Sequence, residues 1–229
     1  MEQQTRKSKD DFAQEAYIGI RRMFFLNEII PDQKISYGDL AKRLKMSTTP
    51  VIQALKRLEI QGLVRHEPNK GYYTESTSLK EIIEIYEFRT LIEHSLLPKT
   101  ISKMTTNGLK KLKKALDNHL EAVRDIYLTE RLVKDREFHL VLAELSGCSI
   151  QVNTLRNLFD LLYLKYRANI LFVTPMDTVD SEHIKLYNCI EDSNTTGAQD
   201  ILKQHISNVK KHAIISIERI NRGKNISTF

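Results

Sequence analysis

Apolar residues recur every three to four positions along most of this chain, which is the spacing of helices that bury one face. Residues 10–27 predict a first helix, with Phe12, Ala16 and Ile20 on its buried side. Further helices are predicted at about 79–103, 106–126, 129–146, 149–172, 181–193 and 197–221. We therefore expect a mostly α fold whose C-terminal part is an all-α bundle of about six helices.

Between the first helix and the bundle, the predicted elements are shorter. Residues 39–45 predict a short helix, a polar turn follows, and a second helix begins at Thr49-Pro50. Thr49 can accept a free backbone N–H there, and Pro50 suits the first helical position. Two strands, Leu63–His66 and Tyr72–Thr74, follow around the turn Pro68–Gly71. Helix, turn, helix and hairpin together predict a winged helix-turn-helix, whose second helix enters the major groove of DNA.

A polar segment, Ser76-Thr77-Ser78, separates the two regions. Ser78 with Glu81 three residues later is the pattern of a capping box, which begins a helix. We therefore expect a DNA-binding domain at residues 1–76 and a helical domain at residues 77–229.

Charge supports a nucleic-acid partner. The 229 residues carry a net charge of +6, and residues 40–70 alone hold seven basic and two acidic side chains. Such a cluster gains affinity by displacing counterions from DNA phosphates. No run of about 18 apolar residues predicts a membrane span, and the charged N-terminus lacks an apolar signal region. Two cysteines give no disulfide framework, so we expect a cytoplasmic protein.

Some polar side chains occupy positions where a helix should be apolar. Arg89 lies in the stripe formed by Ile85 and Ile92. A guanidinium facing a core is costly unless an anion meets it. Glu93, one turn later, or a carboxylate on another helix would satisfy it structurally, and a bound acid would do so functionally.

Asp135 and His139 lie four residues apart, so their side chains converge on one point of a helix surface. His183 and His205 lie among apolar residues of two other helices. A single buried histidine usually only packs in a core, but three with a carboxylate favour a shared metal centre inside the bundle. His66, His94 and His119 lack such neighbours and are expected at the surface or in local hydrogen bonds, while His212 is a competitor for the role of His205.

The chain resembles the GntR family of bacterial transcription regulators, in the branch with a FadR-type C-terminal (FCD) domain. A bundle of six helices rather than seven would resemble the VanR-type subgroup. The resemblance rests on these residues: Leu40-Ala41, Ser47–Val51, Ala54-Leu55, Leu58, Gly62–Val64, Asn69–Gly71, Arg89, Leu91–Glu93, Asp135–His139, Glu182-His183 and His205.

The resemblance implies that Asp135, His139, His183 and His205 bind a divalent metal, with zinc or nickel as the expected ion. It also places Arg89 beside a small organic acid that acts as the effector, because a metal and a guanidinium both attract a carboxylate. Tyr163 and Arg167, one turn apart on the helix predicted at 149–172, could line the same cavity.

The DNA-binding half departs from the family pattern. The usual arginine after Ser47 is Thr48 here, and the usual Arg-Glu pair before Ala54 is Ile52-Gln53. We therefore expect altered base reading, with Gln53 suited to adenine and Ile52 to a thymine methyl. The candidate DNA contacts are Lys42, Arg43, Lys45, Ser47, Thr48, Thr49, Gln53, Lys56, Arg57 and Lys70.

These features predict a homodimeric, ligand-responsive regulator, most simply a repressor, that binds double-stranded operator DNA and a small carboxylate. One alternative is a direct sensor of metal ions. A second is a helical metalloenzyme, but no further acid, base or nucleophile accompanies the ligand set, so we expect no enzyme. A third, a bundle that holds a larger acyl ligand and no metal, leaves the complete ligand set unexplained.

Overall fold

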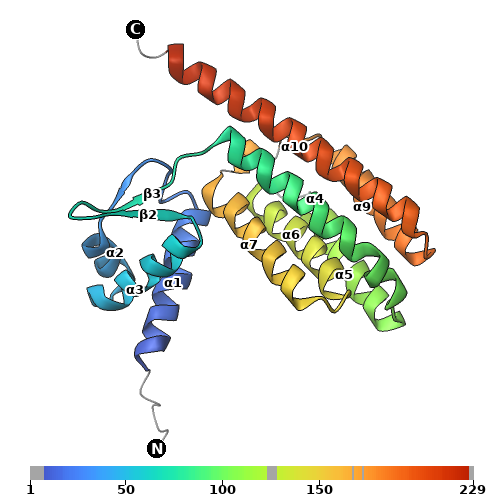
Figure 1. Ribbon diagram of the computed structural model, residues 1–229, viewed down its shortest axis with the longest axis horizontal. Coiled ribbons are helices and arrows are strands. Elements are labelled where there is room, and N and C mark those ends of the chain that lie inside the picture. The colour runs from blue at the N-terminus through green and yellow to red at the C-terminus, as the bar shows by residue number, and fades with distance from the viewer. Residues whose placement is uncertain (1–7, 123–127, 167, 172, 227–229) are drawn as a thin grey trace, which may run out of the picture. The chain divides into compact units, whose positions relative to one another are not determined.

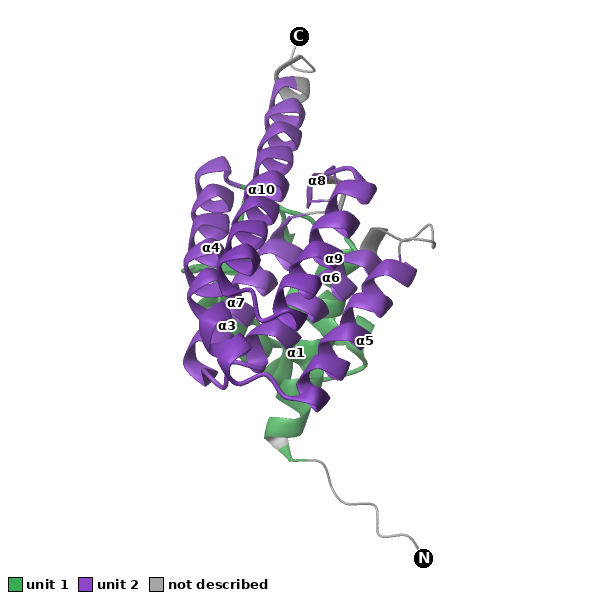
Figure 2. Ribbon diagram, turned by 90° about the vertical axis from the view of Figure 1, so that its right-hand side faces the viewer, with its two compact units in different colours: residues 1–77 green, residues 78–229 purple. Residues whose placement is uncertain are grey.

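The computed structural model describes residues 8–122, 128–166, 168–171 and 173–226. The expected mostly α fold is confirmed, with one small sheet near the N-terminus (Figure 1). The chain divides into two compact units, residues 1–77 and residues 78–229 (Figure 2). Every helix in the described part of the chain is too short or too polar to span a lipid bilayer.

The first unit is the expected winged helix-turn-helix. Its elements are α1 (Lys9–Phe25), β1 (Lys34–Ile35), α2 (Tyr37–Leu44), α3 (Thr48–Ile60), β2 (Val64–Glu67) and β3 (Gly71–Thr74). The antiparallel sheet has the order β1-β3-β2, with Arg65 opposite Tyr73 in the hairpin. Its core contains Ile20, Leu55 and Leu58, all buried. The hydrophobic spacing of the helices therefore predicted this core correctly.

Two local details of this unit differ from expectation. Helix α3 begins at Thr48 with Ser47 in the capping position and no side-chain cap bond, so Thr49 is not the cap and Pro50 is the third helical residue. Proline is tolerated there because the first N–H groups of a helix have no partner within the helix. Strand β1 was not predicted, since two residues are too short to show an alternating pattern.

The second unit is a helical bundle. Its elements are α4 (Leu79–Ser102), α5 (Thr106–Ala122), α6 (Leu128–Glu144), α7 (Ser149–Lys165), α8 (Ala168–Leu171), α9 (Met176–Glu191) and α10 (Thr195–Ile226). Six of these are long, as predicted, and α8 is a single four-residue turn. Helix α10 lies along α4 and α9 (Figure 1). Buried leucine, isoleucine and aromatic side chains from the long helices form one core.

The single helix predicted at 149–172 is broken after Lys165, and Ala168–Leu171 form the separate turn α8. Tyr166 is extended, with φ −103° and ψ 139°, and ends α7. Its hydroxyl donates to Ser78 O at 2.8 Å and lies 3.0 Å from Glu81 Oε2, so it is held at the first turn of α4. This tertiary contact overrides the local helical pattern. Arg167 lies outside the described residues, so its expected place beside Tyr163 has no structural description.

The capping box predicted at the start of α4 forms only in part. Ser78 Oγ accepts from the Glu81 backbone N–H at 3.3 Å, as an N-cap should. The Glu81 carboxylate instead contacts Lys165 Nζ at 2.6 Å and Tyr166. The first turn of α4 is therefore joined to the end of α7.

Candidate metal and effector site

Four side chains from three helices converge inside the bundle. Asp135 and His139 project from α6, His183 from α9 and His205 from α10. One ligand atom from each lies within 4.8 Å of all the others. His183 Nε2 lies 3.3 Å from His139 Nε2 and 3.6 Å from Asp135 Oδ1. This spacing can enclose one metal ion, and the three imidazoles are fully or almost fully buried.

Two glutamates orient the histidines from behind. Glu93 Oε2 lies 2.6 Å from His139 Nδ1, and Glu182 Oε2 lies 2.9 Å from His205 Nδ1. A carboxylate that accepts the Nδ1 proton fixes the ring tautomer and leaves the Nε2 lone pair for a metal. Among the described residues, His183 Nδ1 has no hydrogen-bond partner. Two of the three imidazoles are thus held as ligands by the protein itself.

Two of the four donors, His183 and Asp135, have the protonation state that a metal requires. Burial, with the nearby His205 and His119, lowers the pKa of His183, so its imidazole is neutral at pH 7. Burial alone would raise the pKa of Asp135, but His139 and other neighbouring cations lower it to about 2, so it is ionised. The ionised Asp135 carboxylate and the neutral His183 ring, together with the ring nitrogens of His139 and His205, form a donor set that fits a divalent ion such as zinc or nickel.

Arg89 enters the same region from α4 and is 2% exposed. Its Nε donates to Glu93 Oε1 at 2.8 Å, and its guanidinium lies 4.2 Å above the Phe159 ring. The ion pair with Glu93, which the sequence offered as a structural role for Arg89, is therefore formed. Its Nη2 has no hydrogen-bond partner within the described residues. Part of the guanidinium thus remains available to an anion.

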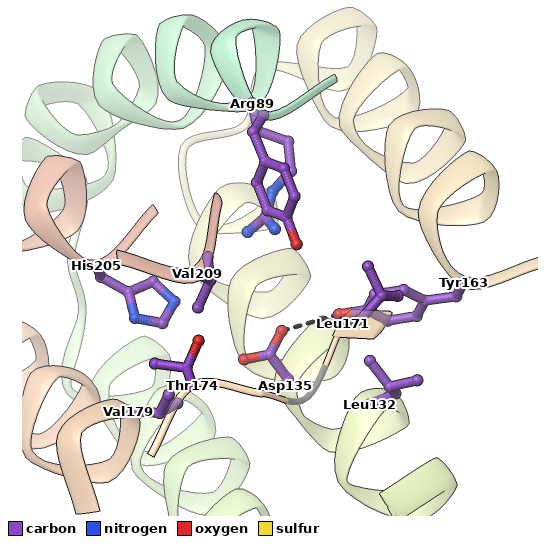
Figure 3. A pocket seen from close by; sticks show the side chains of 10 residues that line it. Arg89, Leu132, Asp135, Tyr163, Leu171, Thr174, Val179, His205 and Val209 are labelled. Carbon is purple, nitrogen blue, oxygen red and sulfur yellow. Dashed lines mark hydrogen bonds between the residues drawn. The ribbon is translucent and has the colours of Figure 1, made fainter. Parts of the chain in front are cut away.

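A small cavity is lined by Arg89 and by two of the four ligand residues, Asp135 and His205 (Figure 3). Its volume is about 20 Å³, which is room for about one water-sized group. It is lined by Tyr86, Arg89, Asp135, Tyr163, Thr174 and His205, together with valine and leucine side chains. The Tyr163 hydroxyl donates to Asp135 Oδ2 at 2.8 Å. Tyr163 therefore lines the cavity, but it also orients a metal-ligand carboxylate.

Three polar residues of this site were missed or misread in the sequence. Glu93 was considered only as a partner of Arg89, and Glu182 only as a neighbour of His183. His119, expected at the surface, is fully buried and lies edge-on to His183, with 4.5 Å between the ring centres. Glu93 falls one turn after Arg89 in the buried stripe of α4, and His119 falls one turn after Ala115 and Leu116 in the buried stripe of α5, so both positions carried a signal.

His212 does not belong to the cluster. It lies two turns beyond His205 on α10, with its Nδ1 3.0 Å from the Asn208 carbonyl oxygen. The local hydrogen bond accounts for this residue without a metal.

The candidate DNA-binding residues of the first unit all lie on exposed positions of α2, α3, the turn between them and the wing. Arg43 pairs with Glu28, and Arg57 donates to Gln14 and lies 4.0 Å above the Tyr17 ring. Lys70 pairs with Glu67 at 3.2 Å. Within the described ranges no ion pair is found for these three side chains: Lys42, Lys45 and Lys56. These lysines are the most available cations on this face.

Comparison with known proteins gives two family matches. The family described as "Bacterial regulatory proteins, gntR family" matches residues 12–73, and the FCD domain matches residues 84–208. Among solved structures, E. coli McbR/YncC superimposes with a TM-score of 0.77 at 16% identity, over 91% of this chain and 98% of that one. The fold of both units is thus shared with a solved protein.

Two relatives match along most of their lengths. The uncharacterized HTH-type transcriptional regulator YdhC of Bacillus subtilis (strain 168) is 24% identical over 197 residues, which cover 86% of this chain and 88% of YdhC. The HTH-type transcriptional repressor RspR of Escherichia coli (strain K12) is 21% identical over 198 residues, covering 86% and 87%. The chain therefore belongs to the GntR family of bacterial regulatory proteins, in the group with an FCD domain, and is a DNA-binding transcription regulator rather than an enzyme.

Proposed function

We propose that this regulator senses a small organic acid in its helical unit and changes its affinity for operator DNA in response. The observation that carries the proposal is that four metal-ligand groups converge in the helical unit and that two of them, Asp135 and His205, line the same cavity as Arg89. Arg89 Nη2 has no hydrogen-bond partner among the described residues. A divalent ion bound by Asp135 and the three histidines would supply a Lewis-acidic charge that attracts a carboxylate. Arg89 would bind and orient the same group through a charge-assisted hydrogen bond.

The protein acts on DNA as a homodimer in this proposal. Two copies of α3 enter successive major grooves of a near-palindromic site, whose half-site spacing the dimer sets. Exposed lysines on α2 and α3 fix the position on phosphates, while Thr48, Thr49 and Gln53 face the bases. Repression is the simplest outcome, because the relatives RspR and GlaR of E. coli are named repressors.

The function is tested by selecting binding sites from genomic DNA and then titrating the recovered operator against a panel of small carboxylic acids. An acid can act only if it binds one arrangement of the regulator more tightly than the other. We expect at least one acid to weaken DNA binding by tenfold or more, measured by fluorescence anisotropy. A panel that leaves DNA affinity unchanged in metal-loaded protein would contradict acid sensing.

A direct metal sensor is the second candidate, and the complete buried donor set favours it. In that case the ion itself is the signal, and zinc or nickel would change DNA affinity in the absence of any acid. The same anisotropy assay, titrated with free metal alone, separates the two functions.

Replacing Lys45 by alanine should weaken binding to every DNA sequence to a similar extent. Lys45 is exposed and lacks an ion pair among the described residues, so it is free to contact phosphate. Loss of one phosphate contact should lower the slope of log affinity against log salt by about 1. Gln53→Ala should instead change which bases are preferred, with the salt slope retained. An operator strongly anchored on guanines would contradict the expected base reading.

A further inference from the structure

Thr174 lies between α8 and α9 and is only 6% exposed. Its hydroxyl has no hydrogen-bond partner in the described part of the chain. Figure 3 shows this oxygen directed into the cavity, with Arg89 reaching into the same space from the opposite side. Burying a hydroxyl without a partner is destabilising, so each such group in a native structure requires an explanation.

A local structural role does not explain the orientation of this hydroxyl. A threonine in front of a helix commonly caps it, but α9 has Pro175 in the capping position and no side-chain cap bond. Among the described residues, the hydroxyl also finds no acceptor in the turn before it. Two buried polar atoms, Thr174 Oγ1 and Arg89 Nη2, therefore face one cavity without partners.

We propose that Thr174 determines the specificity of the site by pairing with a second oxygen of the acid. This inference rests on the proposed acid sensing and restricts the class of acid that the site binds. Arg89 receives the carboxylate, and the Thr174 hydroxyl bonds a hydroxyl or carbonyl oxygen close to that carboxylate. The cavity of about 20 Å³ has room for about one water-sized group, so the site must widen to admit an acid, and a short chain requires the least widening. The effector is thus a short-chain hydroxy or oxo acid rather than an unsubstituted one.

Isothermal titration of the full chain as purified tests this with acids matched in carbon number: glycolate against acetate, lactate against propionate, and malate against succinate. The wild-type protein should bind one hydroxy acid at least about tenfold more tightly than its partner, because a site built to bond a hydroxyl discriminates against the analogue that lacks it. Thr174→Val keeps the side-chain volume and should abolish this preference, while Thr174→Ser should retain it.

Thermal unfolding gives an independent readout. Because the hydroxyl has no protein partner, Thr174→Val should unfold at the same temperature as the wild type or a higher one, whereas a structural hydroxyl would make the variant less stable. A preference that survives in Thr174→Val overturns the inference. Equal binding within every pair overturns the role of Thr174 but leaves acid sensing intact, whereas no binding of any acid contradicts both.

Discussion

Replacing His205 by alanine should abolish metal retention by the purified protein. His205 lies within 4.8 Å of the other three ligand groups, and Glu182 holds its ring in the ligand tautomer. Losing even an outer partner of a metal ligand costs about 10–100-fold in affinity, so the loss of a ligand should exceed that. Elemental analysis should find about one zinc or nickel per wild-type chain and almost none in the variant.

His212→Ala is the matched control, because His212 lies on the same helix, outside the cluster. It should keep the wild-type metal content. Asp135→Asn is a nearly isosteric second variant that should also lose the ion while keeping the volume of the core. A metal content unchanged in both ligand variants would mean that the ion binds elsewhere. Wild-type protein that fails to take up added zinc or nickel would refute the metal centre.

Metal loading should also raise the thermal stability of the wild type. An ion that binds only the folded chain stabilises it by about 4 kcal/mol at a thousandfold excess over its Kd. His212→Ala should show the same increase in unfolding temperature on adding metal, and His205→Ala should show little.

Replacing Arg89 by alanine should lower the free energy of unfolding by about 3–5 kcal/mol, because it leaves a buried carboxylate without its cation. The side chains of Arg89 and Glu93 are only 3% and 2% exposed, so solvent does not compensate for the lost pair. Chemical denaturation measures the effect. Arg156→Ala breaks a pair with Glu144 that is 42% and 51% exposed, and it should cost no more than about 1 kcal/mol. Equal costs for the two variants would show that the pair of Arg89 and Glu93 is effectively solvated.

Testing the sensory role of Arg89 requires a variant that keeps the positive charge. Arg89→Lys retains a cation for Glu93 but loses the planar fork that ends in Nη2. We expect this variant to stay folded and to bind operator, but to need more than tenfold more acid for the same release of DNA. A variant that responds like the wild type would show that Arg89 serves only the fold.

Local patterns predicted much of this protein. Helical spacing gave the positions of most helices, and the i, i+4 spacing predicted that Asp135 and His139 meet, as they do on α6. Whether His183 and His205 join them depends on how α9 and α10 pack; the three histidines and one carboxylate on apolar faces favoured a shared centre, and the family resemblance strengthened that expectation. The break after Lys165 likewise depends on a tertiary contact rather than on local pattern. The burial of His119 could have been predicted, because it follows Leu112, Ala115 and Leu116 at helical spacing.

Glu93 divides its two oxygens between two partners, Arg89 on one side and His139 on the other. One carboxylate therefore serves both the residue that would hold the acid and a residue that would hold the ion. Coupling between two binding events is reciprocal, so any factor by which the ion strengthens capture of the acid applies equally in reverse. Cells that load this regulator with different ions would then respond to the same acid at different concentrations.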